Sequence, residues 1–252
     1  MLEISNITKI FNKEEGIEYQ KKALDCVNLV VEDGDFVSVI GGNGSGKSTL
    51  MNIISGVYKP DSGYIKIDGE DITMLSESKR ASYLGRVFQD PLMGTCANMS
   101  IIENMELASR RGEKQTFKWG FKKTNEILFK EELKRLNLNL ENRLEQKVGL
   151  LSGGQRQAVT LLMATLKKPK LLLLDEHTAA LDPKTAKKVL ELTEKIVTEN
   201  KITTFMITHN MKDALRYGNR LVMLNGGKIV LDAKGEEKAK LTIDDLLEKF
   251  EA

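Results

Sequence analysis

The chain has 252 residues, enough for one large domain or two small ones, and either can bury a substantial core. Its 38 basic and 36 acidic residues leave a net charge of +2, which excludes a nucleic-acid-binding surface that spans the whole molecule. No apolar run approaches the ~20 residues of a membrane-spanning helix, and residues 1–4 have no signal-peptide pattern. If the protein serves a membrane process, we therefore expect it to dock onto another chain. Cys26 and Cys96 have no metal-like spacing and are expected to be reduced thiols of a cytosolic protein.

Strand-like and helical stretches alternate in the first third of the chain. Residues 27–31 and 36–40 are mostly apolar, and the second run is typical of a strand buried on both faces. The glycine-rich residues 41–46 form a loop, and a helical pattern begins at Lys47. Residues 63–69 then predict another short strand.

The alternation resumes after a long helical insertion. The pattern is helical over about 76–168, apart from an irregular basic stretch at 110–123. Residues 171–174 form a continuous apolar strand, and Asp182 and Pro183 predict the N-cap and first position of a helix. Two further segments follow, a buried strand at 202–207 and a hairpin at 221–231. Strands that alternate with helices predict an α/β fold with a mainly parallel sheet and a helical insertion in the middle.

Residues 41–48 match the phosphate-binding pattern G-x-x-x-x-G-K-[ST] at every fixed position. Glycines let successive backbone N–H groups turn toward a phosphate, and the start of the following helix adds a partial positive charge. Lys47 is expected to bridge β- and γ-phosphate oxygens, and the Ser48 hydroxyl to bind Mg²⁺. The alternative, a strand–helix turn with an incidental Lys-Ser, is disfavoured by the predicted strand and helix on either side. The predicted nucleotide-binding residues are Gly41, Gly42, Asn43, Gly44, Ser45, Gly46, Lys47, Ser48 and Thr49.

Two carboxylates follow the apolar strand at 171–174. Ligands of α/β proteins bind at the carboxyl ends of such strands. Asp175 is therefore expected to hold Mg²⁺ through its water shell, and Glu176 to polarise the attacking water. Buried strands often end in acidic residues, so the two carboxylates indicate a catalytic site only in combination with the phosphate loop.

Residues 151–155, Leu-Ser-Gly-Gly-Gln, predict a second anion site at the start of a helix that Ser152 can cap. The segment resembles the signature motif of the ATP-binding cassette (ABC) family and matches that pattern in full. The resemblance implies that the chain binds and hydrolyses ATP with Mg²⁺ as half of a homodimer or of a pair of cassettes. In that dimer the Ser152 motif of one chain covers the γ-phosphate held by Lys47 of the other. The residues implied to act in trans are Leu151, Ser152, Gly153, Gly154 and Gln155.

Further marks of the same family occur in the family's order. Gln89 matches the loop that senses the γ-phosphate and faces the transporter, and Asp182 matches the loop that crosses the dimer interface. His209 matches the switch histidine, and Phe11 is the best match for the aromatic residue that stacks on adenine, with Tyr19 as the alternative. Each has a simpler interpretation: Gln89 as a surface residue, Phe11 as a core side chain, Asp182 as an N-cap only. The resemblance implies Lys47, Glu176 and His209 as the catalytic group, and Ser48, Gln89 and Asp175 around the Mg²⁺.

The resemblance also implies an architecture. A P-loop NTPase core with a mainly parallel sheet would carry an N-terminal antiparallel β subdomain and an inserted α-helical subdomain. The implied single domain 1–252 divides into a core with the β subdomain (about 1–85 and 165–235), a helical subdomain (about 90–164) and a C-terminal helix (about 241–251).

The sequence departs from the family pattern at one position after Glu176. His177 follows Glu176 where most members have proline, and we expect it to be a loop residue without a catalytic role.

Three kinds of partner are known for such cassettes: a membrane permease, DNA and the ribosome. Members that act on DNA need long coiled-coil insertions, whereas only 62 residues (151 minus 89) separate Gln89 from Leu151. Ribosome-associated members carry two cassettes on one chain, and only one copy of each motif occurs here. We therefore expect a transporter subunit without a nucleic-acid partner.

The segments at 85–91, 175–183 and 208–211 resemble one importer branch of the family, associated with tryptophan and tyrosine. The His177 departure fits this branch. The resemblance implies uptake of an aromatic amino acid through a separate permease, with an extracellular substrate-binding protein, at the cytoplasmic face of a bacterial membrane. An export or lipoprotein-release system is the alternative.

The basic stretch at 110–123 is open to two interpretations. Its cations are Arg110, Arg111, Lys114, Lys118, Lys122 and Lys123, against the single acid Glu113, with Phe117, Trp119 and Phe121 interleaved. A solvated loop on the helical insertion is one interpretation. Contact with a permease or with anionic lipid headgroups is the other.

Overall fold

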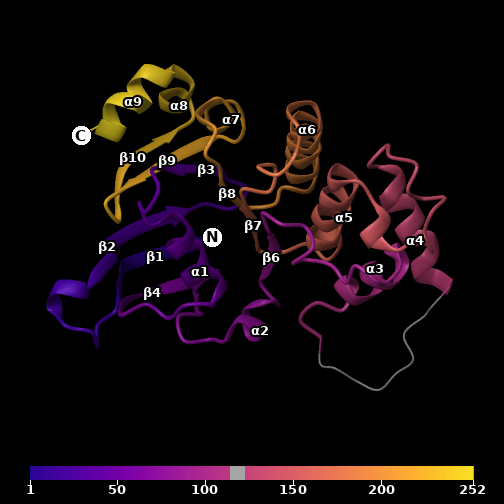
Figure 1. Cartoon of the computed structure of the whole chain (residues 1–252), viewed down its shortest axis with the longest axis horizontal. Helices are drawn as coiled ribbons and strands as arrows, with labels where there is room; N and C mark the ends of the chain where they lie inside the picture. Colours follow the sequence, from indigo (N-terminus) through magenta and orange to yellow (C-terminus); the bar gives the residue numbers. More distant parts are fainter. Residues whose placement is uncertain (114–122, 252) are drawn as a thin grey trace.

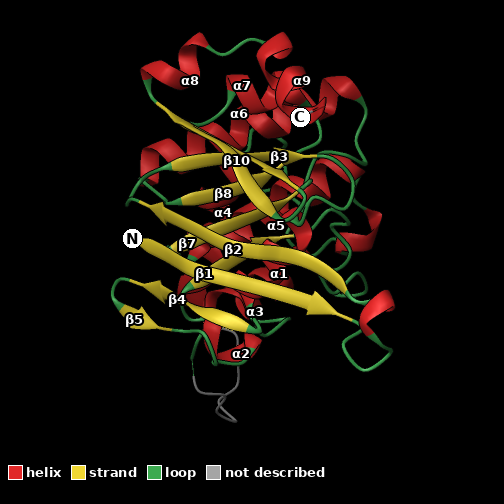
Figure 2. Cartoon of the chain, turned by 90° about the vertical axis from the view of Figure 1, so that its left-hand side faces the viewer, coloured by secondary structure: helices red, strands yellow, loops and turns green. Residues whose placement is uncertain are grey.

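A computed structural model describes residues 1–113 and 123–251, and its strands form two sheets (Figures 1 and 2). The first sheet is antiparallel and has the strand order β2-β1-β4-β5. Its strands are β1 (Leu2–Phe11), β2 (Lys21–Val31), β4 (Ser62–Ile67) and β5 (Glu70–Asp71). This is the antiparallel β subdomain that the family resemblance implied.

The second sheet has the order β10-β9-β3-β8-β7-β6 and is parallel except for the edge pair of β9 with β10. Its strands are β3 (Phe36–Gly41), β6 (Leu84–Val87), β7 (Leu171–Asp175), β8 (Thr204–Ile207), β9 (Arg220–Asn225) and β10 (Lys228–Lys234). The predicted hairpin is confirmed, since β9 and β10 pair across the Asn225-Gly226-Gly227 turn. The mainly parallel α/β fold is confirmed as well.

Strand β7, which lies between β8 and β6, shows why a continuous apolar run forms an inner strand of this sheet. Leu171 and Leu173 face one core cluster, and Leu172 and Leu174 face another. Side chains alternate between the faces of a strand, so a strand that is covered on both faces needs apolar residues at every position. The carboxyl end of β7 thereby carries its two acidic residues to the edge of a rigid, buried layer.

The helices divide between the core and the insertion. Around the core lie α1 (Lys47–Ser55), α2 (Glu77–Arg80), α6 (Pro183–Asn200), α7 (Met211–Arg216), α8 (Glu236–Lys240) and α9 (Ile243–Glu251). The insertion contains α3 (Ile101–Ser109), α4 (Lys123–Lys134) and α5 (Gly153–Leu166), and two short 3₁₀ turns lie at Ile17–Tyr19 and Val148–Leu150. Within the described residues, no helix has both the length and the apolarity needed to cross a bilayer.

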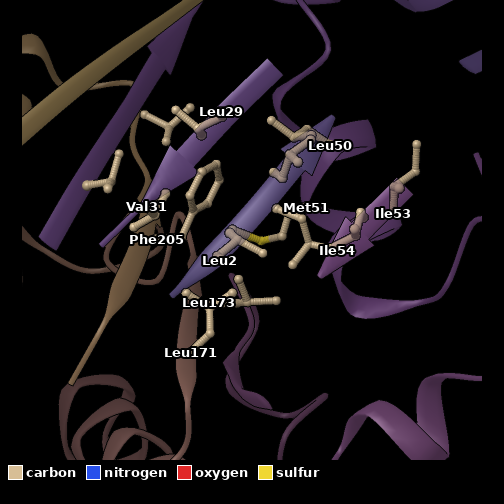
Figure 3. Packing of buried hydrophobic residues seen from close by; sticks show 14 of the residues in the cluster. Leu2, Leu29, Val31, Leu50, Met51, Ile53, Ile54, Leu171, Leu173 and Phe205 are labelled. Carbon is tan, nitrogen blue, oxygen red and sulfur yellow. The ribbon is translucent and has the colours of Figure 1, made fainter. Parts of the chain in front are cut away.

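Helix α1 lies between the two sheets and packs against both (Figure 3). Its buried Leu50, Met51 and Ile54 join a cluster with Leu2 of β1 and Phe205 of β8. The helix that follows the glycine-rich loop is therefore fixed on two sides.

One expectation about the insertion is wrong. The pattern over about 76–168 predicted helix, but Leu84–Val87 is a strand, β6, which pairs in parallel with β7. Leu84 pairs with Leu171 and Val87 with Leu174, so the partner strand provides hydrogen bonds that local helical periodicity does not anticipate. The insertion accordingly begins after β6.

Candidate active site

A pocket of about 300 Å³ opens where the glycine-rich loop meets the carboxyl ends of β7 and β8. It is lined by residues 43–49, by Phe11 of β1, Lys21 and Ala23 of β2, and by Glu176 and His209. The structure thus brings together most of the predicted nucleotide-binding residues and all three predicted catalytic residues, Lys47, Glu176 and His209. Lys21 and Ala23 were not predicted.

The loop leaves the start of α1 uncapped. Gly46 occupies the N-cap position with φ +106°, and no side chain accepts a hydrogen bond from the first turn. A Cβ on Gly46 would lie 2.6 Å from the carbonyl oxygen of Ala23, so only glycine fits this position. The Oγ of Ser45 is buried without a hydrogen-bond partner in the described part of the chain. Free N–H groups at a helix start that faces a pocket suit an anion, and phosphate above all.

Lys47 is held in place by the loop itself. Its buried ammonium donates to the carbonyl oxygens of Gly41 at 2.8 Å and Gly42 at 3.0 Å. Burial lowers the pKa of Lys47, and the negative charge of Glu176 opposes that effect. Among the described residues, Lys47 has carbonyl partners and no ion-paired carboxylate, so its charge is available to an anionic ligand.

Glu176 and His209 form a pair at the pocket wall. The Oε1 of Glu176 lies 2.5 Å from Nε2 of His209. Glu176 follows β7 with φ +45°, and its N–H donates to the carbonyl of Ile207 in β8 at 3.1 Å. A left-handed conformation is costly for a residue with a Cβ, and such strain concentrates at functional sites. Two neighbouring strands thus hold a carboxylate and an imidazole against each other, the arrangement that proton transfer from a water molecule requires.

Asp175 is anchored by a residue that the sequence analysis did not single out. Arg86 of β6 approaches Asp175 with Nη2 at 3.4 Å from Oδ2, and it also donates to Asn52 at 2.9 Å and Ser55 at 3.1 Å in α1. Its guanidinium lies 4.6 Å from the ring centroid of Phe88, next to Gln89. The sequence pattern did not predict β6 as a strand, and only the pairing of β6 with β7 places Arg86 beside the carboxylate of Asp175. The contact could therefore not be predicted.

The chemistry of the donors suits Mg²⁺. Ser48 offers a hydroxyl at the pocket and Asp175 a carboxylate at the end of β7. A set of one hydroxyl and one carboxylate fits an ion that keeps several waters and takes phosphate oxygens as further ligands. Gln89, the third predicted ligand, is exposed on the loop after β6 and does not line the pocket.

The signature segment forms a second helix start away from this pocket. Ser152 caps α5 by accepting from the N–H of Gln155, and the Gln155 side chain accepts from the N–H of Ser152. A Cβ on Gly154 would lie 2.2 Å from Cγ2 of Thr185 in α6, so a close helix contact requires glycine there. Residues 151–155 are absent from the pocket lining, and Ser152 and Gly153 are exposed. Within one chain, the two helix starts do not meet.

Asp182 caps α6, where its Oδ1 accepts from the N–H of Thr185 at 3.1 Å. Hydrogen bonding by the side chain of Thr185, and then by its N–H, holds the pKa of Asp182 below its usual value. The carboxylate is exposed. Asp182 therefore caps α6 and keeps one side of its carboxylate open to solvent.

The aromatic candidates differ in their placement. Phe11 lines the pocket and packs edge-on against Tyr58, with ring centroids 5.4 Å apart. Tyr19 is 60% exposed and does not line the pocket. Of the two predicted residues, only Phe11 is in a position to stack on a base in this pocket.

His177 points away from the pocket into the protein. Its side chain is 2% exposed, and Nε2 lies 3.1 Å from Oγ1 of Thr193 in α6. Burial lowers the pKa of His177 to about 4, so the imidazole is neutral near pH 7. The residue that replaces proline thus ties the loop after Glu176 to α6.

Only part of the basic stretch falls within the described residues. Arg110 pairs with Glu106 of α3 at 2.9 Å, and Arg111 donates to the carbonyl oxygens of Ala164 and Lys167 at the end of α5. Lys114, Phe117, Lys118, Trp119, Phe121 and Lys122 lie outside the described residues, and Lys123 begins α4. The two arginines act as links within the insertion.

Known proteins share this arrangement. The family model described as "ABC transporter" matches residues 24–179, more than half of the chain. The chain belongs to the ABC transporter family. It is an ATP-hydrolysing cassette of an ABC transporter.

Individual relatives cover the whole cassette. The chain is 50% identical over 252 residues to the tyrosine transport ATP-binding protein of Clostridioides difficile (strain R20291), covering 100% of this chain and 99% of that one. It superposes with a TM-score of 0.82 on the ADP conformation of the cassette MJ1267, at 29% identity over 100% of this chain and 98% of that chain. With MJ0796 of Methanocaldococcus jannaschii, a dimer bound to ADP and phosphate after hydrolysis, it shares a TM-score of 0.76 and 32% identity over 93% of this chain and 98% of that chain.

Proposed function

We propose that this cassette powers the uptake of an aromatic amino acid, tyrosine foremost, through a separate membrane permease. The observation that carries the proposal is the 50% identity along the full chain to a tyrosine transport ATP-binding protein. The earlier resemblance of residues 85–91, 175–183 and 208–211 to an aromatic amino-acid importer branch agrees with it. The permease, which the cassette would contact from the cytoplasmic face of a bacterial membrane, would carry the specificity for the cargo, together with an extracellular substrate-binding protein.

In the proposed cycle, ATP enters the pocket with its base against Phe11 and its phosphates in the loop. N–H groups of the loop and of the first turn of α1 donate to the phosphate oxygens. Lys47 leaves the carbonyls of Gly41 and Gly42 and binds the β- and γ-phosphate oxygens. Its depressed pKa returns toward the ordinary value as the anionic nucleotide arrives.

Hydrolysis requires a base for the attacking water. Glu176 accepts the water's proton, and His209, paired with that carboxylate at 2.5 Å, orients it and contacts the γ-phosphate. Asp175 and Ser48 would hold Mg²⁺, which would neutralise negative charge on the bound phosphates. Arg86 fixes Asp175 from β6, and Gln89, on the loop after β6, would be the third residue around the ion.

The site is completed by a second cassette. In the proposed isologous dimer, Ser152 and the N–H groups of Gly153 and Gly154 in one chain cover the γ-phosphate bound to the other. Asp182 lies on the surface that crosses the interface. The exposure of Ser152 and Gly153 and the separation of both helix starts in one chain support this arrangement. We propose no nucleic-acid partner, because the net charge is only +2.

A transport assay tests the assignment. Cells that express this cassette with its genomic permease should take up labelled tyrosine, and cells with the Glu176→Gln variant should not. Labelled leucine serves as the control cargo, and tryptophan as the second aromatic candidate. If the variant loses tyrosine efflux instead of uptake, the protein serves an exporter. If the fluxes of all three amino acids are unchanged in the variant, the proposed aromatic cargo is wrong.

A further inference from the structure

A lysine on the antiparallel sheet shares the nucleotide pocket with Phe11. In the register of β1 with β2, Phe11 and Lys21 are direct partners. Directly opposed residues of an antiparallel pair project from the same face of the sheet. Phe11, Lys21 and Ala23 all line the pocket, as expected for residues on one face. The wall that carries the aromatic ring therefore also carries a cation.

The ammonium of Lys21 reaches the tip of the phosphate loop. Its Nζ lies 3.8 Å from the position that a Cβ on Gly44 would occupy. Gly44 and Lys21 both line the pocket, so the cation and the loop border the same space. Any nucleotide that stacks on Phe11 and extends its phosphates into the loop passes beside Lys21.

The two lysines of the pocket have different surroundings. Lys47 is buried and feels the charge of Glu176, which places it at the hydrolytic end. Lys21 is exposed and, among the described residues, has no ion pair. Its neighbour Lys22 pairs with Asp25 at 3.2 Å. Lys21 is thus a cation without a carboxylate, placed at the junction between the base and the phosphates.

We propose that Lys21 binds the α- and β-phosphates of the nucleotide and so sets affinity for both ATP and ADP. The inference rests on the proposed nucleotide site at Phe11 and Lys47. Because the contact is to phosphates that are present before and after hydrolysis, it stabilises the ground state and the transition state equally. Binding of that kind changes affinity and leaves the rate at saturation unaltered.

The test compares Lys21→Met with Lys22→Met. Both variants remove one positive charge from adjacent positions of β2, but only Lys21 lines the pocket. Calorimetric affinities for ATP, ADP and adenosine, and the ATPase kcat, are measured for both variants and for the wild-type protein. Lys21→Met should weaken ATP and ADP about tenfold, within the range of a hydrogen bond to a charged group, while adenosine affinity and kcat stay within about twofold.

Two controls make the result specific. Lys22→Met should change no affinity by more than about twofold, and Lys21→Arg should retain ADP affinity because it keeps the charge. Higher salt should weaken ADP binding less in Lys21→Met than in the wild-type protein, since one phosphate-facing cation is gone.

The proposal fails if Lys21→Met binds ADP like the wild-type protein, or if it loses adenosine and ADP affinity equally. Lys47→Ala separates this outcome from an error in the site itself. If Lys47→Ala loses ADP while Lys21→Met keeps it, the site stands and only the role of Lys21 is wrong. If Lys47→Ala still binds ADP normally, the pocket is not the nucleotide site and both proposals fall.

Discussion

Two helices of this cassette begin at predicted anion sites, and their beginnings are built differently. Helix α1 begins after Gly46 without a side-chain cap, inside a pocket that is also lined by Phe11, Glu176 and His209 of the same chain. Helix α5 begins at Ser152 with a full capping box and exposes its first residues to solvent. At the start of α1, no side chain among the described residues caps the helix, which leaves N–H groups available to a ligand. At the start of α5, Ser152 caps the helix without a ligand, and we propose that a second chain brings the nucleotide to it.

The largest expected effect concerns the pocket at the start of α1. Glu176→Gln should lower the ATPase kcat by about 10³-fold, within the range of a lost general base, while ATP still binds. The neutral amide keeps the shape of the carboxylate but cannot accept the proton. Steady-state ATPase rates and calorimetric ATP affinity measure the two quantities. Glu237→Gln, an exposed carboxylate in α8, is the matched control and should behave like the wild-type protein. Rapid turnover by Glu176→Gln would remove this residue from the role.

The next effect concerns the packing that supports the start of α5. Gly154→Ala should lower the free energy of unfolding by about 2 to 3 kcal/mol, because the new methyl group overlaps Cγ2 of Thr185. Thr185→Ser removes that methyl group but keeps the hydroxyl. Combined with Gly154→Ala it should recover most of the loss, as denaturant unfolding of all four proteins would reveal. Additive effects of the two substitutions would contradict the contact.

Acid should weaken the contact that His177 makes between the loop after Glu176 and α6. The pKa of His177 is lowered from 6.5 to about 4 by burial, so the unfolded chain binds a proton that the folded chain does not between these values. The contribution of His177 is therefore fully present above pH 6.5 and is lost as the pH falls toward 4. The free energy of unfolding should drop by about 2 kcal/mol from this residue between pH 7 and pH 5.

His177→Gln lacks the titrating group and should flatten the pH dependence of stability in that window. Chemical denaturation of both proteins at several pH values measures the difference. A slope that is unchanged in His177→Gln would assign the pH dependence to other groups.

The smallest expected effect on stability comes from Ser152, which caps α5 and is proposed to contact the nucleotide of the other chain. Ser152→Ala removes the cap of α5 and should cost about 1 kcal/mol of folding stability. Asp182→Ala removes the cap of α6 and serves as a comparison for stability. If Ser152 acts across the interface, its variant should lose more ATPase activity than the stability change explains. Full activity of folded Ser152→Ala would restrict the hydroxyl to capping.

Local sequence predicted the parts of the site that are contiguous. The phosphate loop, the strand at 171–174 and the acids behind it each lie within one short segment, and the structure places them as expected. The pattern did not reveal β1 as a strand, and the antiparallel sheet followed from family resemblance only. Strand β6 was mistaken for helix because it is short and depends on β7 for its hydrogen bonds.

The residues that were missed depend on pairing between distant segments. Lys21 reaches the pocket through its register with Phe11, and Arg86 reaches Asp175 through the pairing of β6 with β7. Neither contact can be predicted from the hydrophobic periodicity of the sequence or from the spacing of its motifs. Alternation along β2 is the one signal that could have placed Lys21 and Ala23 on the same face.

The composite site is tested most directly by the mass of Glu176→Gln in solution, measured by light scattering with and without ATP. If the start of α5 in each chain covers the nucleotide bound at the start of α1 in the other chain, ATP should convert the protein to a dimer of twice the 28.2 kDa chain mass. ADP should leave it monomeric, since the γ-phosphate that bridges the chains is missing. A protein that binds ATP and remains at 28.2 kDa would contradict the account.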